Sequence, residues 1–147
     1  MKLRTDIALQ PAAPDAEGGL RSLVLCGGRG TGLVLTGSEL KAAVGTPAGT
    51  VLFVAYGDPF EESLTITLAG PDWQILDEAT LAASGASGSF EDLVLMQPDA
   101  MSFRFFGNRR MILTAYERPR LTIPLDAFGL GLQRPFQWQR WFRLKAA

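Results

Sequence analysis

Hydrophobic and polar residues alternate along much of the chain, and this pattern predicts short β-strands. Near the start, Leu3, Thr5, Ile7 and Leu9 share one side of a stretch with a period of two residues. Later apolar runs are each bounded by Gly, Pro, Asn or Asp, and they cover residues 20–26, 33–36, 51–56, 64–69, 93–97, 101–106, 110–117 and 120–125. About nine to eleven strands at this spacing indicate a mostly β fold, an antiparallel β-sandwich or barrel.

The clearest local signal is a hairpin in the second half of the chain. Alternating runs at 101–106 and 109–116 are separated by Gly107 and Asn108, two residue types that tolerate a positive φ in a tight turn. A loop is expected earlier, where residues 10–19 are polar and rich in proline and glycine. The pattern therefore predicts two antiparallel strands within residues 101–116.

Two short segments have the composition of helices instead. Residues 38–45 begin with Ser38 as a helix N-cap, continue with good helix formers and end at Gly45. Residues 77–83 are a second short candidate, which ends in a flexible run of Ser and Gly. The sequence thus predicts one or two short helices beside the strands, within a single domain that spans residues 1–147.

The composition is that of an ordinary globular protein, with 47% hydrophobic and 20% charged residues. No run approaches the roughly 20 apolar residues that cross a bilayer, so no membrane span is expected. The first residues lack the apolar stretch of a secretory signal, and Cys26, the single cysteine, has no internal disulfide partner. These features together predict a cytoplasmic protein.

The residue types that are missing restrict the chemistry more than any motif does. The chain has no histidine and one cysteine, which excludes a Ser-His-Asp triad, an imidazole proton shuttle and a Cys/His zinc or iron–sulfur site within one chain. Catalysis would have to use carboxylate, lysine, tyrosine or arginine side chains, or a hard cation held by oxygen atoms. We therefore predict no cofactor and no bound metal, and the balance is against an enzyme.

A glycine-rich segment at 26–32 has the backbone freedom of an anion-binding loop, and Arg29 adds a positive charge to it. A dinucleotide-binding loop would open a helix, whereas here Leu33 continues the segment as a strand. The favoured interpretation is a glycine-rich hairpin loop. Cys26 is expected to be a small buried hydrophobic residue.

Asp58, Glu61 and Glu62 place three carboxylates in a predicted turn between two strands. Neighbouring carboxylates can serve acid–base catalysis or bind a divalent cation, so these residues form an alternative acidic site. Their spacing does not match a calcium-binding loop. The favoured interpretation is an exposed turn that contributes little to folding.

Charge is distributed unevenly along the chain. Residues 42–103 contain nine acids and no Lys or Arg, a net charge of −9, whereas residues 104–147 contain nine bases and two acids, a net charge of +7. Such a separation indicates either an interaction surface of one sign or acidic and basic strands that neutralise each other within a sheet. Both alternatives remain open, with neutralisation within the sheet favoured.

The end of the sequence interleaves aromatic and basic side chains. In residues 135–145, four aromatic residues alternate with Arg140, Arg143 and Lys145. The pattern suits stacking on single-stranded nucleic acid, but a pI near 5.4 and the acidic middle of the chain argue against a nucleic-acid partner. The favoured interpretation is a closing strand whose inward rings fill the core with Leu144, while the stem of Arg140 extends to solvent.

No motif assigns a function, so the prediction rests on the charge separation and on the aromatic and basic tail. We expect a non-catalytic interaction or ligand-binding domain, with a protein partner or self-association into a homo-oligomer. The predicted binding residues are Arg140, Trp141, Arg143 and Lys145. The alternative is a carboxylate-based or metal-dependent enzyme that uses the acidic site.

Overall fold

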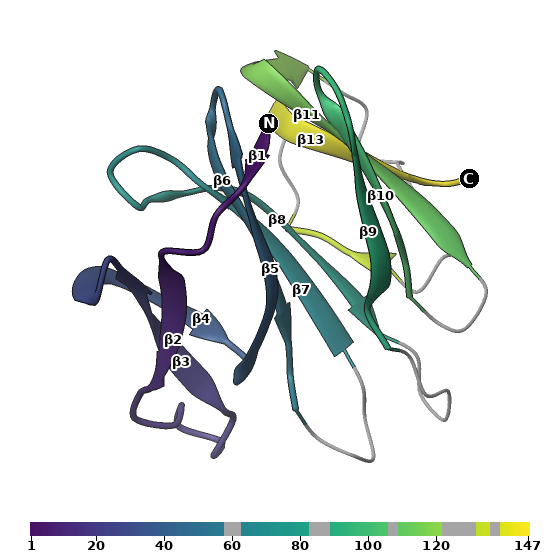
Figure 1. The fold of residues 1–147 in the computed structure, drawn as a ribbon. Coiled ribbons are helices and arrows are strands. Elements are labelled where there is room, and N and C mark those ends of the chain that lie inside the picture. Colours follow the sequence, from purple (N-terminus) through teal and green to yellow (C-terminus); the bar gives the residue numbers. More distant parts are fainter. Residues whose placement is uncertain (58–62, 83–88, 106–108, 122–131, 136–138) are drawn as a thin grey trace.

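The strands form three antiparallel sheets in the computed structural model, which describes residues 1–57, 63–82, 89–105, 109–121, 132–135 and 139–147 (Figure 1). In spatial order, the six-stranded sheet consists of Lys2–Leu3 (β1), Glu39–Thr46 (β5), Gly49–Ala55 (β6), Ser63–Ala69 (β7), Ile75–Ala82 (β8) and Leu132–Gln133 (β12). The four-stranded sheet consists of Gln139–Ala146 (β13), Arg110–Leu121 (β11), Ala100–Arg104 (β10) and Glu91–Met96 (β9). The three-stranded sheet consists of Ile7–Pro11 (β2), Arg21–Cys26 (β3) and Arg29–Thr36 (β4).

The six-stranded sheet lies between the other two sheets and packs against both of them (Figure 1). We call the layer that it forms with the four-stranded sheet the first core, and the layer that it forms with the three-stranded sheet the second core. The sheets are stacked open layers, as in a sandwich, and they do not close into a barrel. The prediction of a mostly β, antiparallel fold is confirmed.

Strand β6 shows how one sheet supplies both cores. Its residues alternate, so that Val51 and Phe53 point into the first core and Leu52 and Val54 point into the second. All four are at most 1% exposed. A strand that is covered on both faces is apolar at successive positions, which accounts for the unbroken apolar run at 51–56.

Aromatic rings fill the centre of the first core. Phe53 of β6 lies 5.3 Å from Phe103 of β10 and 4.9 Å from Phe90, between ring centroids. Phe90 and Phe103 are stacked at 5.3 Å. Contacts between rings at these distances add to the burial of their apolar surface, so this cluster holds the two larger sheets together.

The two predicted helices are wrong, because residues 39–46 form β5 and residues 75–82 form β8. In β5, Ala43 faces the second core and Val44 faces the first, so both sides of the segment are buried. Pairing with neighbouring strands and burial outweigh a local helical preference of a few tenths of a kcal/mol per residue. No described part of the chain forms a helix suited to crossing a membrane.

The strands of both predicted hairpins are paired as expected. Gly27 and Gly28 join β3 to β4 with φ angles of 59° and 82°, which confirms the glycine-rich hairpin loop. Strands β10 and β11 pair antiparallel up to Arg104 opposite Arg110, which confirms the strands of the second hairpin. Its connection at 106–108 lies outside the described residues.

Candidate functional site

Strand β13 carries all four predicted binding residues, but its alternation separates them. Arg143 and Lys145 are exposed on one side of the strand. Arg140 is only 3% exposed, and Trp141 is half-buried and packs against the first core. The expectation that the Arg140 stem extends to solvent is therefore wrong.

The closing-strand interpretation is confirmed for the described part of the tail. Phe142 and Leu144 are buried in the first core, and β13 pairs with β11 along its length. Phe136 and Trp138, which the sequence placed on the same inward side, lie outside the described residues.

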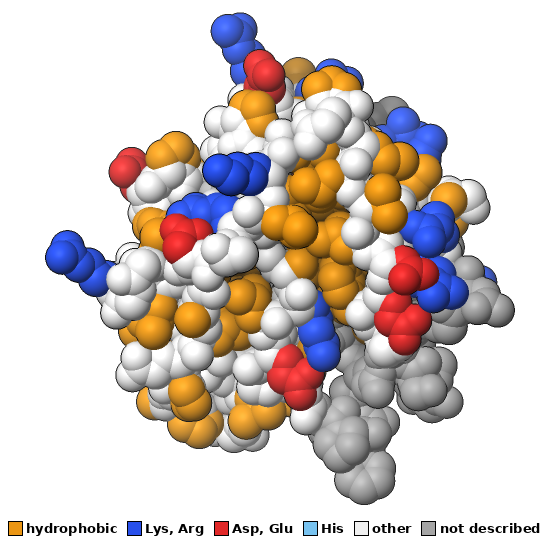
Figure 2. Space-filling view, viewed as in Figure 1, with side chains coloured by type: hydrophobic (Ala, Val, Ile, Leu, Met, Phe, Trp, Pro, Cys, Tyr) orange, Lys and Arg blue, Asp and Glu red, His pale blue; other side chains and the backbone are white. Residues whose placement is uncertain are grey.

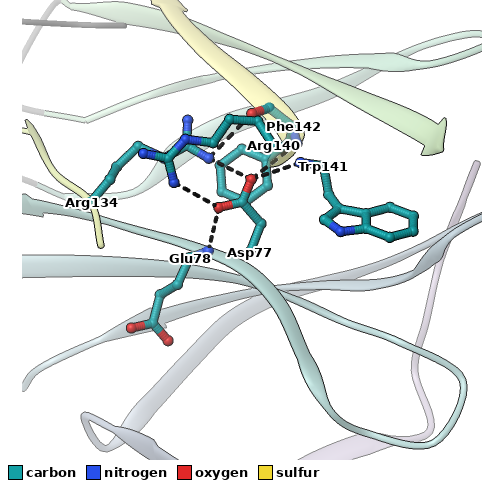
Figure 3. Close-up of polar contacts among 6 residues, drawn as sticks. All are labelled: Asp77, Glu78, Arg134, Arg140, Trp141 and Phe142. Atoms are coloured by element: carbon teal, nitrogen blue, oxygen red, sulfur yellow. Dashed lines mark hydrogen bonds and ion pairs between the residues drawn. The ribbon is translucent and has the colours of Figure 1, made fainter. Parts of the chain in front are cut away.

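A buried carboxylate explains why Arg140 points inward. The side chain of Asp77 in β8 is completely buried. Its Oδ2 atom accepts hydrogen bonds from Arg134 Nη2 at 2.7 Å and from the backbone N–H groups of Trp141 at 2.8 Å and Phe142 at 3.3 Å (Figure 3). Its Oδ1 atom accepts from Arg140 Nη1 at 3.3 Å. The carboxylate thus joins the six-stranded sheet to the four-stranded sheet.

The geometry around Asp77 suits a structural role. The N–H of Glu78 also donates to Oδ1, at 2.9 Å, so both carboxylate oxygens accept more than one hydrogen bond. Hydrogen bonds and opposite charges are what a buried ionised carboxylate requires. A catalytic acid or base instead needs an oxygen that a substrate can reach. Neither carboxylate oxygen of Asp77 is accessible in this way, and we interpret the cluster as a structural connection between the six-stranded and four-stranded sheets.

Salt bridges divide the bases of the C-terminal third into two groups. Arg104 lies 2.6 Å from the carboxylate of Asp92, and Arg110 lies 3.9 Å from the same group. Here acidic and basic strands neutralise each other, as the sequence favoured. Arg109, Arg118 and Arg120 make no ion pair within the described part of the chain. The same is true of Arg143 and Lys145.

These two unpaired bases begin two rows that cross the four-stranded sheet from β13 to β9. The first row consists of Arg143, Thr114, Ala100 and Met96, and the second consists of Lys145, Ile112, Ser102 and Val94. We call these residues the outer face. Each row changes from a base on β13 to an apolar side chain on β9, where Val94 is 49% exposed and Met96 is 37% exposed.

The alternative acidic site cannot be placed, because Asp58, Glu61 and Glu62 lie outside the described residues. Their exposed-turn interpretation stays a prediction. Within the ranges that the structure describes, no three acidic or cysteine side chains gather as metal ligands.

Cys26 lies beside an ion pair that the sequence did not reveal. Arg4 Nη2 is 2.6 Å from Asp6 Oδ2 and 3.3 Å from Cys26 Sγ. The same guanidinium donates to Thr50 Oγ1 at 2.8 Å and so connects the segment between β1 and β2 to β6. Hydrogen bonding from Arg4 lowers the pKa of Asp6 to about 2. Cys26 packs against the second core but is only half-buried, so the expectation of a buried hydrophobic residue is wrong.

Three hollows adjoin the turn between β5 and β6, with volumes of about 380, 630 and 240 Å³, and all three are lined by Thr46 and Pro47. Their sizes overlap the range of ligand pockets. In the first hollow the Arg120 guanidinium already lies 4.1 Å from the centre of the Tyr116 ring. Because this aromatic face is engaged within the chain, the outer face is the stronger candidate site.

Sequence reasoning missed Asp77 and Arg134. The only available signal was the two-residue period of a strand. This period places Asp77 on the same face as Ala79 and Leu81, and Arg140 on the same face as Phe142. No protein-family model, curated protein or solved structure matches this chain. The geometry of the chain is therefore the basis for its functional interpretation.

Proposed function

We propose that this chain is a non-catalytic interaction domain, and that its outer face holds an acidic segment of a protein partner. One observation carries the proposal. Arg143 and Lys145 are exposed and make no ion pair among the described residues. In the same two rows, Val94 and Met96 expose apolar surface.

The layout of the rows defines the partner segment. Neighbouring strands lie about 4.8 Å apart, so a row across four strands spans roughly 14 Å. Between its ends lie the half-buried side chains of Thr114, Ala100 and Ile112. Ser102 is only 5% exposed and accepts a hydrogen bond from Arg110 Nη1 at 2.9 Å. A segment that crosses the sheet therefore meets two bases first and apolar side chains last. We expect carboxylates at one end of it and aliphatic side chains at the other.

The two ends would contribute differently to binding. Exposed charges guide association and fix orientation more than they add affinity. Apolar contact with Val94 and Met96 adds roughly 25 cal/mol for each Å² removed from water. The partner is thus selected by its acids and retained by its aliphatic residues.

The Asp77 cluster offers no candidate catalytic group, because the described donors around it hold its carboxylate between the layers. The alternative of a carboxylate-based or metal-dependent enzyme rests on Asp58, Glu61 and Glu62. These lie outside the described residues, and no described feature favours that alternative.

The test is a titration with a fluorescent peptide that carries four glutamates followed by alternating leucine and valine. The wild-type chain is compared with the double variant Arg143→Glu/Lys145→Glu. A matched control, Arg21→Glu/Arg29→Glu, reverses two exposed charges on the three-stranded sheet. We expect about tenfold weaker binding for the first variant and no change for the control.

Salt provides a second readout, since rising ionic strength screens exposed charges. Wild-type affinity should fall with added salt, and the affinity of Arg143→Glu/Lys145→Glu should change less. Equal weakening in both double variants, or a peptide that the wild-type chain does not bind, would contradict the proposal.

A further inference from the structure

Strand β9 is the sheet edge with the fewest features that prevent pairing with another strand. Natural edges are protected by short length, proline, glycine-induced twist or charge. Strands β1 and β12 have two residues each, β2 ends in Pro11, β4 begins at Arg29 and is rich in glycine, and β13 exposes Arg143 and Lys145. In β9 the charges are confined to Glu91 and Asp92 at its start, where its pairing with β10 is irregular, and residues 93–96 are Leu-Val-Leu-Met.

The free edge of β9 adjoins an apolar seam between the two larger sheets. Figure 2 shows hydrophobic side chains gathered between β5 and β9 on the face turned to the viewer. Half-buried residues on these strands, or just before β1 and β9, pack against the first core: Met1, Ala42, Phe90, Leu93 and Leu95. A strand added to β9 would extend the sheet over part of this seam.

We propose that two copies of this chain associate through β9, each β9 pairing antiparallel with the other. On the side away from β10, β9 has no strand partner among the described residues, so its outward N–H and C=O groups are available for pairing. Two identical antiparallel strands are related by a two-fold axis normal to the sheet, so one residue lies opposite its own copy. The core-facing residues of both copies then lie on the same side of one continuous sheet.

The side chains of β9 select Val94 as the residue on the axis. In that register Leu93 lies opposite the partner's Leu95, and both belong to the core-facing set. Asp92 lies opposite the partner's Met96, so the acidic end of each strand meets an apolar end. The exposed side chain of Val94 meets its own copy on the outer side of the sheet.

The neighbouring registers are less favourable. An axis at Leu95 would limit the pairing within β9 to residues 94–96, because the strand ends at Met96. An axis at Leu93 would pair residues 91–95, as many as the 92–96 of the Val94 register, but it would place both acids of each strand opposite apolar side chains, Glu91 opposite Leu95 and Asp92 opposite Val94. The Val94 register is therefore the five-residue pairing in which Leu93 lies opposite Leu95 and only one acid of each strand lies opposite an apolar side chain.

The inference goes beyond the proposed function, because it concerns the edge of β9 and a second copy of the chain. Its first test is the mass of the wild-type chain in solution, measured by light scattering or sedimentation over a range of concentrations. We expect the mass of two chains at high concentration and dissociation on dilution. A single-chain mass throughout the range would overturn the proposal.

The second test places charges on the axis. Val94→Lys should give a single-chain mass, because two ammonium groups would then face each other. The matched control is Ile75→Lys, since Ile75 on β8 is also 49% exposed and lies outside β9. The control should keep the wild-type mass. A dimer that survives Val94→Lys, or dissociates equally in Ile75→Lys, would overturn the proposal.

Mixing two variants distinguishes symmetric pairing from other association. Val94→Lys and Val94→Glu should each be single chains, and their equimolar mixture should recover the mass of two, because opposite charges would face each other across the axis. If another β-strand occupies the edge, the mixture stays single-chain, which also overturns the proposal. Val94 also belongs to the outer face, so peptide binding is tested with Arg143→Glu/Lys145→Glu, whose residues lie on β13 at the opposite edge of the sheet, and the two proposals can fail independently.

Discussion

The two faces of the six-stranded sheet are covered in different ways, and an aspartate bound by arginine lies beside each of the two cores. In the first core, Asp77 is completely buried and binds Arg140 and Arg134 beside a cluster of phenylalanines. The second core consists mainly of aliphatic residues, and the pair of Asp6 and Arg4 lies at its rim, where the Asp6 side chain is 46% exposed.

The difference shows that the contribution of an ion pair to the folded state depends on how much water reaches it. Water already solvates Asp6, so its hydrogen bonds with Arg4 replace bonds that solvent would otherwise supply. Asp77 has no such substitute, and all its partners must come from the chain. The side chain of Arg140 reaches Asp77 from the inward side of β13, so a slip of this strand by one residue would turn Arg140 away from the carboxylate. The buried pair therefore fixes how the layers align.

The largest effect is expected from removing β13, which supplies part of the first core and the Arg140 partner of Asp77. Deleting residues 136–147 takes away the buried side chains of Phe142 and Leu144 and leaves Asp77 without Arg140. Loss of one buried phenylalanine costs roughly 3–5 kcal/mol, and a domain has about 5–15 kcal/mol in total. We expect a chain with no cooperative thermal transition by circular dichroism.

The control for that deletion is Arg143→Ser/Lys145→Ser, which changes only exposed side chains of the same strand. It should melt within a few degrees of wild type. A truncated chain that remains a cooperatively folded monomer would show that β13 is an accessory arm.

The next change compares the two pairs directly through the same substitution. Asp77→Ala leaves buried guanidinium groups with fewer partners, and breaking a buried pair in this way costs about 3–5 kcal/mol. Asp6→Ala should cost much less, because its pair is exposed. Urea denaturation measures both free energies of unfolding. Similar midpoints for the two variants would contradict the contrast between the faces.

The smallest effect is a pH dependence at the rim of the second core. Arg4 lowers the pKa of Asp6 from 3.8 to about 2, so the pair stabilises the folded state at neutral pH. This contribution is lost as Asp6 becomes protonated between about pH 4 and about pH 2. The stability difference between wild type and Asp6→Asn should therefore shrink over that range in thermal melts. A difference that is constant with pH would exclude the effect.

Much of the strand pattern could be predicted from the sequence, because it depends on neighbouring residues. The unbroken apolar run of β6 and the Gly27-Gly28 turn each carry their own local signal. The two wrong helices had equally clear local signals. Their conformation depends on strands that lie on both sides of them, and a propensity counted along the chain does not include these neighbours.

The candidate site, like the fold, could be predicted only in part from the sequence. Exposure of Arg143 and Lys145 follows from alternation along β13, once its inward residues are known. The burial of Arg140 does not, because its partner Asp77 is 63 residues away and was assigned to a helix. The outer face also required the register of four strands, which a single sequence does not specify.

The position of Asp77 also has a consequence for the order of folding during synthesis. Strands β5 to β8 pair between neighbours in the chain, so this part of the sheet can form as soon as it leaves the ribosome. The arginines that bind Asp77 are translated 57 and 63 residues later. Until they emerge, the carboxylate has neither counter-charge and must stay in water. The nascent sheet therefore keeps one face open, and a late translational pause would lengthen its exposure to chaperones and to aggregation.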